Sequence, residues 1–229
     1  MVVEHVGPFI EPVLHGHTPL PCTTAMDTSF LPFTPTFSAE HSTIVPKPLS
    51  EVFEKLGTAS AHVEVCRLSS LCTAINLKEK DAVALASGKS VENSDFLRTP
   101  ASSPEELKAA SRVAHRQHFN LEETIPVAFG LIKSKVMIRG TLTWTQPEAL
   151  ALESGGPLYA VYESEVIGGF AIRIYRLRKM EATEEGDSSA TKVTEFLYGV
   201  GPSYMNFLIA KEAATKHRAH MQRLPELFQ

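Results

Sequence analysis

The chain contains little cysteine and no long apolar run. Its three cysteines, Cys22, Cys66 and Cys72, are spaced irregularly, which suits neither a disulfide framework nor a C-x-x-C metal or redox site. We therefore expect free, buried thiols. No apolar stretch reaches the roughly 18 residues that a membrane-spanning helix needs, and the N-terminus lacks the basic start and short apolar segment of a signal peptide. These absences predict a cytoplasmic protein.

Familiar catalytic and nucleotide-binding motifs are also missing. The sequence has no G-x-G-x-x-G, no P-loop, no G-x-S-x-G elbow and no H-E-x-x-H. A net charge of −4 gives no basic field for a phosphate backbone, so no nucleic-acid partner is expected. His115 and His118 imitate a metal pair at the end of an expected helix, but no acidic third ligand is placed near them, so no metal site is expected.

The length and amino-acid composition of the chain are typical of one globular domain with an extension. The chain has 229 residues, of which 43% are hydrophobic and 21% charged. Residues 1–35 are expected to form an extended arm, because they carry six prolines, and residues 36–229 the folded domain. We expect the arm to cover a pocket or a dimer surface, and in the second case the protein would be a homodimer.

Strand-like sequence begins early and dominates the second half of the chain. Residues 36–45 alternate apolar and polar side chains, and residues 61–68 are a further strand candidate. Beyond residue 118, five segments rich in β-branched and aromatic residues are separated by GG or EEGDSS turns, and they span 136–145, 149–155, 157–166, 168–182 and 190–200. This succession predicts an antiparallel meander.

Two short helices are expected before the meander. The first follows Pro48 and ends at Gly57, a residue that suits a helix C-terminus. The second covers 103–117, where Ser103 and Glu106 have the spacing of a capping box. The rest of the stretch from 58 to 118 does not follow a clear pattern.

A long amphipathic helix is expected at the end of the chain. Ser203 suits its N-cap and Pro225 marks its end. Its apolar stripe also contains one polar residue, His217, and consists otherwise of Phe207, Ala210, Ala213, Ala214, Met221 and Leu224. The whole order predicts an α+β fold in which a curved antiparallel sheet wraps around this helix.

Three segments carry a resemblance to a known superfamily. They are EHSTIVPKPLSEVFEKLG, ATKVTEFLYGV and GPSYMNFLIAKEAATKHRAHMQRL. Their order resembles the helix-grip plan of the START-like superfamily, also called SRPBCC, which includes Bet v 1-like ligand carriers and polyketide cyclase/dehydrases. With its proline-rich leader, the chain looks like members found in fungal secondary-metabolite clusters. The resemblance implies an apolar cavity between sheet and terminal helix, sized for a lipid or polycyclic ligand, and no obligatory cofactor.

Two functions follow from this resemblance. The first is a cofactor-independent cyclase, dehydratase or isomerase that acts on a hydrophobic polyketide- or terpenoid-like intermediate, including a pericyclic ring closure. The second is a carrier that binds a lipid, sterol or quinone without chemistry. A groove that grips another protein is a third alternative. Replacement of a catalytic Glu195 by glutamine should abolish turnover in the enzyme and leave a carrier unaffected.

Three residues are candidates for catalysis. Glu195 shares strand parity with Val193 and Leu197, so this carboxylate enters the cavity if that face is inward. His41 alternates with apolar residues in the first strand and could act as a base, although a structural histidine fits the pattern too. Tyr159 could pair with Glu163 as acid and base, unless the two lie exposed on their strand.

Five further residues are candidates for substrate binding. The opposite parity of the last strand would turn Phe196 and Tyr198 inward. Trp144, the only tryptophan, should face core or pocket. Phe207 and His217 lie on the stripe of the terminal helix, where a histidine near the C-terminus also suits the helix dipole.

Overall fold

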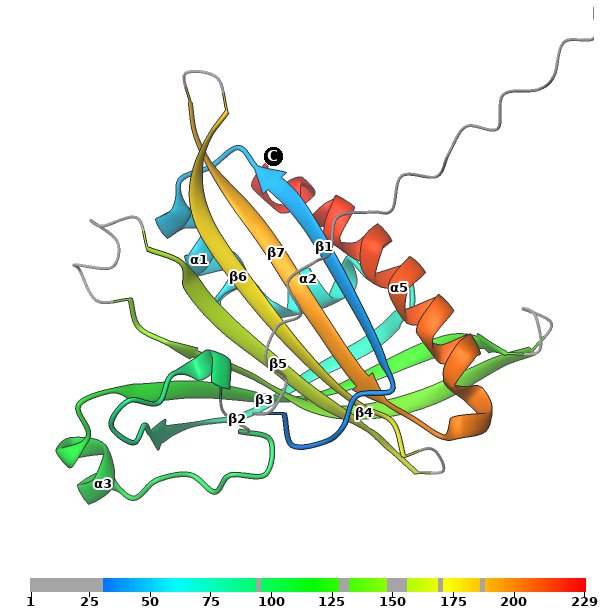
Figure 1. The fold of residues 1–229 in the computed structure, drawn as a ribbon, viewed down its shortest axis with the longest axis horizontal. Helices are drawn as coiled ribbons and strands as arrows, with labels where there is room; N and C mark the ends of the chain where they lie inside the picture. The colour runs from blue at the N-terminus through cyan, green and yellow to red at the C-terminus, as the bar shows by residue number, and fades with distance from the viewer. Residues whose placement is uncertain (1–30, 94–95, 128–131, 148–155, 169–170, 186–187) are drawn as a thin grey trace, which may run out of the picture.

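A computed structural model describes residues 31–93, 96–127, 132–147, 156–168, 171–185 and 188–229. Seven antiparallel strands form one curved sheet in the order β1-β7-β6-β5-β4-β3-β2 (Figure 1). They are β1 (Phe37–Val45), β2 (Cys72–Ala84), β3 (Val113–Val127), β4 (Ile132–Thr145), β5 (Leu158–Ile167), β6 (Arg173–Glu185) and β7 (Ser188–Val200). Most of the proline-rich arm and the strand expected at 149–155 lie outside the described residues.

Three of the helices lie on the concave face of the sheet or along its edge (Figure 1). The short helices α1 and α2 lie across the concave face, and the long α5 runs beside β1 (Figure 1). Helical segments are α1 (Leu49–Leu56), α2 (His62–Arg67), η1 (Val91–Asn93), α3 (Pro104–Ala109), η3 (Ser203–Met205), α5 (Asn206–Arg223) and η4 (Leu224–Phe228), where η denotes a 3₁₀ helix. No described helix has the length and apolarity to span a membrane.

The chain crosses the sheet once and then proceeds by neighbouring strands. Strands β1 and β2 are consecutive in the sequence but occupy opposite edges, and α1 with α2 connects them across the concave face. From β2 to β7 every strand pairs with the next one, and β7 then pairs with β1. Gly168 has φ of 80°, a left-handed conformation that glycine adopts readily, in the predicted turn after β5. This is the expected α+β helix-grip plan.

Local signals placed the first strand and two helix ends correctly. The helix after Pro48 ends at Gly57, whose N–H bonds to the carbonyl of Phe53. Ser103 and Glu106 form the predicted capping box. The helix that they begin is shorter than predicted, because the chain enters β3 at Val113.

The prediction of a strand at residues 61–68 was wrong. Residues His62–Arg67 form α2 instead. Val63 and Val65 give this segment a strand-like pattern, but the chain lies on the crossover between sheet edges, where one helical turn buries His62, Val65 and Cys66 against the sheet. Tertiary packing therefore outweighs local propensity here.

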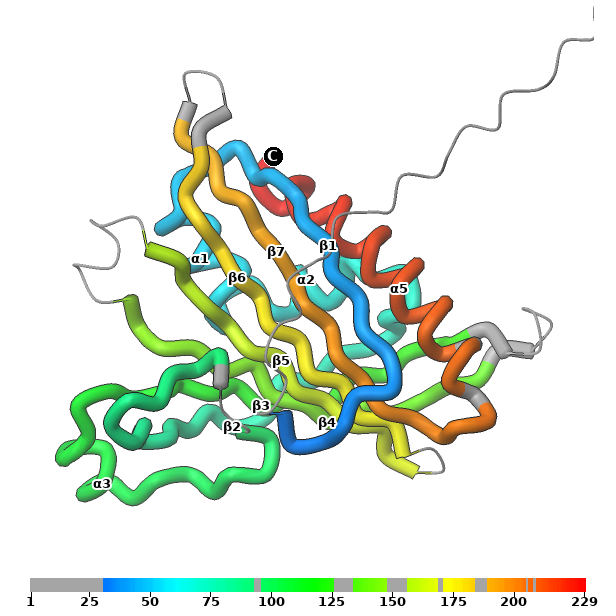
Figure 2. The backbone as a smooth tube through the Cα atoms, viewed as in Figure 1, coloured from blue at the N-terminus to red at the C-terminus, as the bar shows by residue number. Residues whose placement is uncertain are grey.

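Apolar side chains pack on both faces of the sheet. The concave cluster includes Phe53, Leu142, Trp144, Val193 and Leu224 and lies beneath α1, α2 and the end of α5. A second cluster on the convex face joins strand residues such as Leu177 and Tyr198 to Leu31, Val91 and Phe96. The segment from Leu85 to Arg112 thus folds back over the convex face, and the tube of Figure 2 traces this excursion next to β2 and β3.

Candidate functional site

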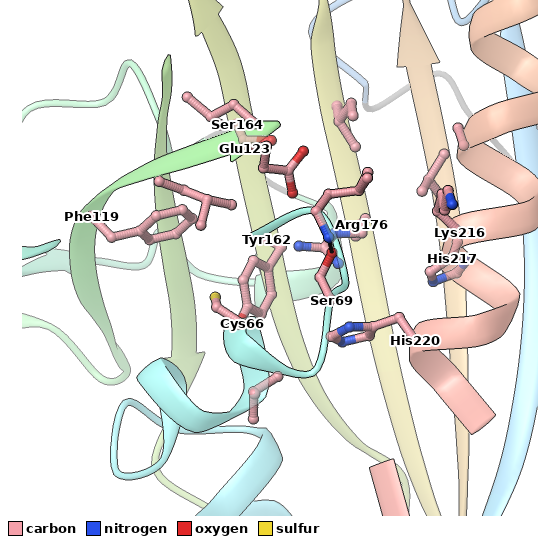
Figure 3. Close-up of a pocket in the computed structure, with 17 residues that line it drawn as sticks. Cys66, Ser69, Phe119, Glu123, Tyr162, Ser164, Arg176, Lys216, His217 and His220 are labelled. Carbon is pink, nitrogen blue, oxygen red and sulfur yellow. Dashed lines mark hydrogen bonds between the residues drawn. The ribbon is translucent and has the colours of Figure 1, made fainter. Parts of the chain in front are cut away.

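A cavity of about 160 Å³ lies between the concave face, α2 and α5 (Figure 3). Much of its wall is apolar and comes from three strands and the α2 region, including Val65, Leu71, Phe119, Leu121, Ile138 and Leu197. Its polar lining includes Glu123, Arg176, Lys216, His217 and His220. A mostly apolar cavity with a few converging polar groups is the usual form of a small-molecule site.

A row of charged side chains crosses the concave face beside this cavity. Strand register places His41 of β1 opposite Glu195 of β7, and Glu195 opposite Arg178 of β6. All three side chains project to the concave side because side chains in one lateral row of a sheet share a face. The row continues through Ala160 to Trp144 in the core.

Glu195 is fully buried and fully engaged. Its Oε1 accepts a hydrogen bond from Nε of Arg178 at 2.6 Å, and its Oε2 accepts one from Nε2 of His217 at 2.6 Å. Burial alone would raise the pKa of this carboxyl, but the Arg178 charge and the His217 hydrogen bond outweigh burial and hold the pKa well below its usual range. Glu195 is therefore held as an anion, and its two oxygens fix the positions of Arg178 and His217.

Arg178 and His217 tie separate elements to this anion. Arg178 also donates to the carbonyl of Leu56 at the end of α1, so it joins β6, β7 and α1. His217 brings α5 to the same carboxylate and packs its ring against that of His41, with centroids 5.1 Å apart. Nε2 of His41 lies 3.1 Å from the carbonyl of Ala214 on α5. The cluster thus joins the sheet to the terminal helix.

A second buried group lies at the α2 end of the cavity. The Tyr162 hydroxyl donates to Nδ1 of His62 at 2.6 Å, and burial, followed by the charges of Arg178 and Arg176, lowers the pKa of His62 to about 3. The imidazole is therefore neutral and can accept this bond. Burial raises the pKa of the Cys66 thiol to about 12, which makes it a poor nucleophile.

Arg176 of β6 is one of the charged side chains that line the cavity. Its guanidinium stacks on the Tyr162 ring at 4.5 Å from the centroid. Its nearest carboxylate oxygen, Oε2 of Glu195, is 3.9 Å away, which is too long for a hydrogen bond. Arg176 lines the cavity and makes no hydrogen bond to any residue within the described ranges.

Two further groups in the cavity have unused polar atoms. Glu123 lines the cavity without a hydrogen bond to any described residue, and burial raises the pKa of its carboxyl although the Arg176 charge opposes the shift. Nε2 of His220 is buried and likewise has no hydrogen-bond partner among the residues described. Burial is the main reason that the pKa of His220 falls to about 3. A carboxyl with a raised pKa can exchange protons with a bound molecule, and a neutral imidazole can form a hydrogen bond to one.

The structure brings three of the predicted residues together. Of the two parities left open for β7, the structure has the one that turns Glu195 inward, where Glu195 contacts His217 and neighbours His41. Of these, His217 lines the cavity, whereas Glu195 lies behind it. Trp144 faces inward, as predicted, but belongs to the concave core and does not line the cavity.

The other four predicted residues are placed away from the cavity. The alternative parity of β7 is wrong, because Phe196 and Tyr198 belong to the convex cluster. Tyr159 lies on that face too, since the inward residues of β5 are Ala160, Tyr162 and Ser164. Phe207 is 85% exposed at the start of α5, because the helix buries only its C-terminal half against the sheet.

Several cavity residues were not predicted, and the reason is visible in the pattern of β6. In this strand, Ile174 and Met180 alternate with Tyr175 and Leu177, so both faces look equally apolar. The two arginines that turn inward, Arg176 and Arg178, could be located only by the pairing of Arg178 with Glu195 across strands. Glu123 lies in a segment for which no strand was predicted.

In the part of the chain that the structure describes, no group of three or more His, Cys, Asp or Glu side chains lies close enough together to hold a metal ion. His115 and His118 lie on β3, not at the end of a helix, so a spacing of three turns them to opposite faces. His118 contacts Asp81 at 3.0 Å, whereas the ring of His115 lies near Trp144.

Comparison with known proteins shows a similarity of fold to solved structures and no similarity to a known family. No family model matches the chain, and no curated protein matches it. Among solved structures, a hypothetical protein from Helicobacter pylori is 11% identical over 93% of this chain and 100% of its own, with a TM-score of 0.51. A protein from Thermus thermophilus is 14% identical over 82% and 94%, with a TM-score of 0.42. Ara h 8.0201 is 11% identical over 82% and 96%, with a TM-score of 0.37. At such identities the Helicobacter protein shares the fold, and nothing further follows.

Proposed function

We propose that the chain is a cofactor-independent enzyme that moves protons in a hydrophobic biosynthetic intermediate, as a cyclase, dehydratase or isomerase. Polyketide- or terpenoid-like compounds are the proposed substrates, in keeping with the resemblance to START-like proteins of fungal secondary metabolism. The observation that supports this proposal is the Glu123 carboxyl, which lines a largely apolar cavity with no hydrogen-bond partner among the described residues and a raised pKa. Such a carboxyl is suited to general acid–base catalysis.

The proposed step is proton transfer at a carbon next to a carbonyl group. The Glu123 carboxylate takes a proton from that carbon, and the electron pair of the broken C–H bond moves toward the carbonyl oxygen to form an enolate. The positive charges of Arg176 and Lys216 in the same cavity stabilise the negative charge that develops. Return of the proton to another atom, or loss of a hydroxyl, then gives isomerisation or dehydration without a cofactor.

Cavity size limits the part of the substrate that is enclosed. An engineered protein cavity of about 150 Å³ holds one benzene molecule, and the present cavity measures about 160 Å³. It therefore encloses one ring, and the remainder of a larger intermediate would extend through the opening. The volume is smaller than the resemblance implied for a lipid or polycyclic ligand, which favours reaction at one ring over complete enclosure of a sterol.

Glu195 has a positioning role in this proposal. Its carboxylate holds His217 in the cavity wall and does not itself reach the cavity. The catalytic carboxyl is thus reassigned from Glu195 to Glu123.

Hydrogen–deuterium exchange on a small ketone tests the proposal without knowledge of the natural substrate. Cyclohexanone has one ring, and its α-hydrogens exchange in D₂O at a rate that NMR measures. The wild-type protein should accelerate this exchange above buffer, and Glu123→Gln should lower the catalysed rate by about 10²-fold or more. Glu122→Gln is the matched control, because this neighbouring carboxylate points to the surface and contacts Lys135.

Native mass spectrometry of the purified protein would identify the natural ligand class. A copurified apolar compound that binds to Glu123→Gln but is converted only by the wild type supports the enzyme. Binding without conversion or exchange by either protein would instead support the carrier function. Equal exchange rates for wild type and Glu123→Gln would reject Glu123 as the catalytic group.

A further inference from the structure

The cavity has an excess of hydrogen-bond donors on one wall. Arg176 carries five N–H donors on its guanidinium group and makes no hydrogen bond to a described residue. Lys216 on α5 also lines the cavity and forms no ion pair with the described carboxylates. In the view of Figure 3, the Arg176 side chain lies between Glu123 and His220. Unused charged donors in a half-buried site are costly unless a ligand or water satisfies them.

An independent observation on the same wall comes from His220. This residue is 8% exposed, and its Nε2 has no hydrogen-bond partner among the described residues. Because its low pKa keeps the imidazole neutral, one ring nitrogen carries a proton that it can donate. A buried polar atom that lines a cavity and lacks a partner indicates the position of a ligand atom.

The carboxylates near this wall do not neutralise the positive charges of Arg176 and Lys216. Glu195 is occupied by Arg178 and His217, and its nearer oxygen remains 3.9 Å from Arg176. Glu123 is the only carboxylate among the described residues that line the cavity, and its raised pKa indicates that the Arg176 charge does not fully offset the effect of burial. Arg176 and Lys216 thus leave positive charge available to a ligand.

We infer that the cavity binds a ring compound that carries a carboxylate, with the carboxylate oxygens held by Arg176 and His220. A guanidinium group can bind a carboxylate through two parallel N–H donors, which fixes the orientation of the ligand as well as its charge. The ring then lies against the apolar wall around Phe119 and Leu121. This inference rests on the proposed function and specifies its substrate class as cyclic or aryl carboxylic acids.

The orientation has a consequence for the proposed chemistry. A carbonyl group next to the bound carboxylate would place its oxygen on the side of Arg176. Glu123 lies next to Arg176 in the view of Figure 3, so the α-hydrogens of a compound bound in this way would lie in the same part of the cavity as the proposed base. Carboxylate binding therefore positions the substrate for the proton transfer.

Two single-ring probes test the inference. Benzoate and benzyl alcohol have the same ring and differ in charge, and both are small enough for the cavity. Titration of the ¹⁵N-labelled full chain, followed by amide chemical shifts, gives the affinity and location of each. Wild type should bind benzoate at least about tenfold more tightly, because a charge-assisted hydrogen bond contributes about 1.5–3 kcal/mol, or a factor of ten or more.

Variants assign this preference to the cavity wall. Arg176→Gln should weaken benzoate about tenfold and leave benzyl alcohol unchanged. Arg218→Gln is the matched control, because Arg218 is exposed on α5 and does not line the cavity; both affinities should equal those of the wild type. If circular dichroism shows that Arg176→Gln is unfolded, Lys216→Gln supplies the same test, with an expected loss of about threefold for benzoate.

The outcomes separate this inference from the proposed function. Equal binding of both probes, unchanged by Arg176→Gln or Lys216→Gln, would overturn carboxylate recognition and leave the catalytic proposal intact. Absence of shifts at cavity residues with either probe would overturn both, since no ring compound would then enter the cavity.

Discussion

Glu195 shows how a single buried residue can hold separate elements of a fold together. It has no exposed surface, and it accepts hydrogen bonds from Arg178 on the neighbouring strand and His217 on the terminal helix. Removing one partner of such a buried group leaves uncompensated charge, which typically costs more than the pair itself contributes.

We predict that Glu195→Gln lowers the free energy of unfolding by about 3–5 kcal/mol. Glutamine keeps the shape of the side chain but cannot neutralise Arg178, which is buried away from water. Urea unfolding followed by circular dichroism measures the loss. Glu40→Gln serves as the control, because Glu40 is exposed on the other face of β1 and should change stability by less than about 0.5 kcal/mol. A loss below about 1 kcal/mol for Glu195→Gln would show that the cluster is not the main link between sheet and helix.

The sequence left two parities open for β7, one of which turns Glu195 inward, and it did not identify the partners of this carboxylate. Parity shows which residues share a face of a strand, and it correctly groups Glu195 with Val193 and Leu197, but it does not say which face is inward. It failed for Arg176 and Glu123, since their positions depend on which strands are neighbours and on where α5 crosses them. Such information is tertiary, and no single segment contains it.

At the scale of elements, the excursion from Leu85 to Arg112 is held by Arg116 of β3. This arginine is 2% exposed, pairs with both Asp81 oxygens at 2.6 Å, and donates to the carbonyls of Phe96 and Thr99. Glu163 of β5 accepts the N–H groups of Phe96 and Leu97 at 2.7 and 2.9 Å. Two charged side chains of the sheet thus satisfy the backbone of a segment that has little regular structure.

Arg116→Met should release this excursion from the convex face. The loss of its hydrogen bonds to two carbonyls, with Asp81 left without its arginine, is expected to cost about 3 kcal/mol or more. Hydrogen exchange of the amides of residues 96–102 should accelerate more than that of β5 to β7, because the opening is local. Arg139→Met is the control. The Arg139 side chain is 61% exposed and pairs with Glu165, so its loss should cost less than about 1 kcal/mol. Uniform acceleration across the sheet would contradict local release.

Helices and strands were predicted where local chemistry decides them. The capping box at Ser103 and the alternating pattern of β1 needed no distant contacts. The α2 helix and the convex excursion could not be predicted, because each is shaped by the surface on which it packs. In both cases buried side chains from other elements override the pattern of the segment itself.

At the scale of the whole molecule, three buried groups, His62, His220 and Glu195, each make the protein less stable as the pH falls. Burial holds the pKa values of His62 and His220 at about 3, against an ordinary value of 6.5, so the unfolded chain binds more protons than the folded one between pH 6.5 and 3. Their contribution is fully present above pH 6.5 and is lost as the pH falls toward 3. Glu195, with its depressed pKa, adds stability above its ordinary pKa of 4.5 that is lost at still lower pH.

We predict that stability declines steadily as the pH is lowered from 6.5, and that His220→Gln makes the decline less steep. Each histidine contributes up to about 1.4 kcal/mol per pH unit in this interval. Urea unfolding at several pH values between neutrality and about pH 4 measures the slope for wild type and variant. The same slope in both proteins would mean that His220 takes up its proton in the folded state as readily as in the unfolded chain.

The position of β1 has a consequence for how the chain is made. Its strand partner in the described sheet is β7, which begins at Ser188, whereas β1 itself ends at Val45. During synthesis on the ribosome β1 must therefore wait, unpaired, until β7 emerges, and α5 can close over both only after its own residues have followed. Contacts between such distant segments form slowly, and incomplete chains expose strand edges that other chains can pair with. Nascent chains that end before β7 are therefore expected to depend on chaperones, whereas in the finished protein β7 and α5 lie against β1 and shield it.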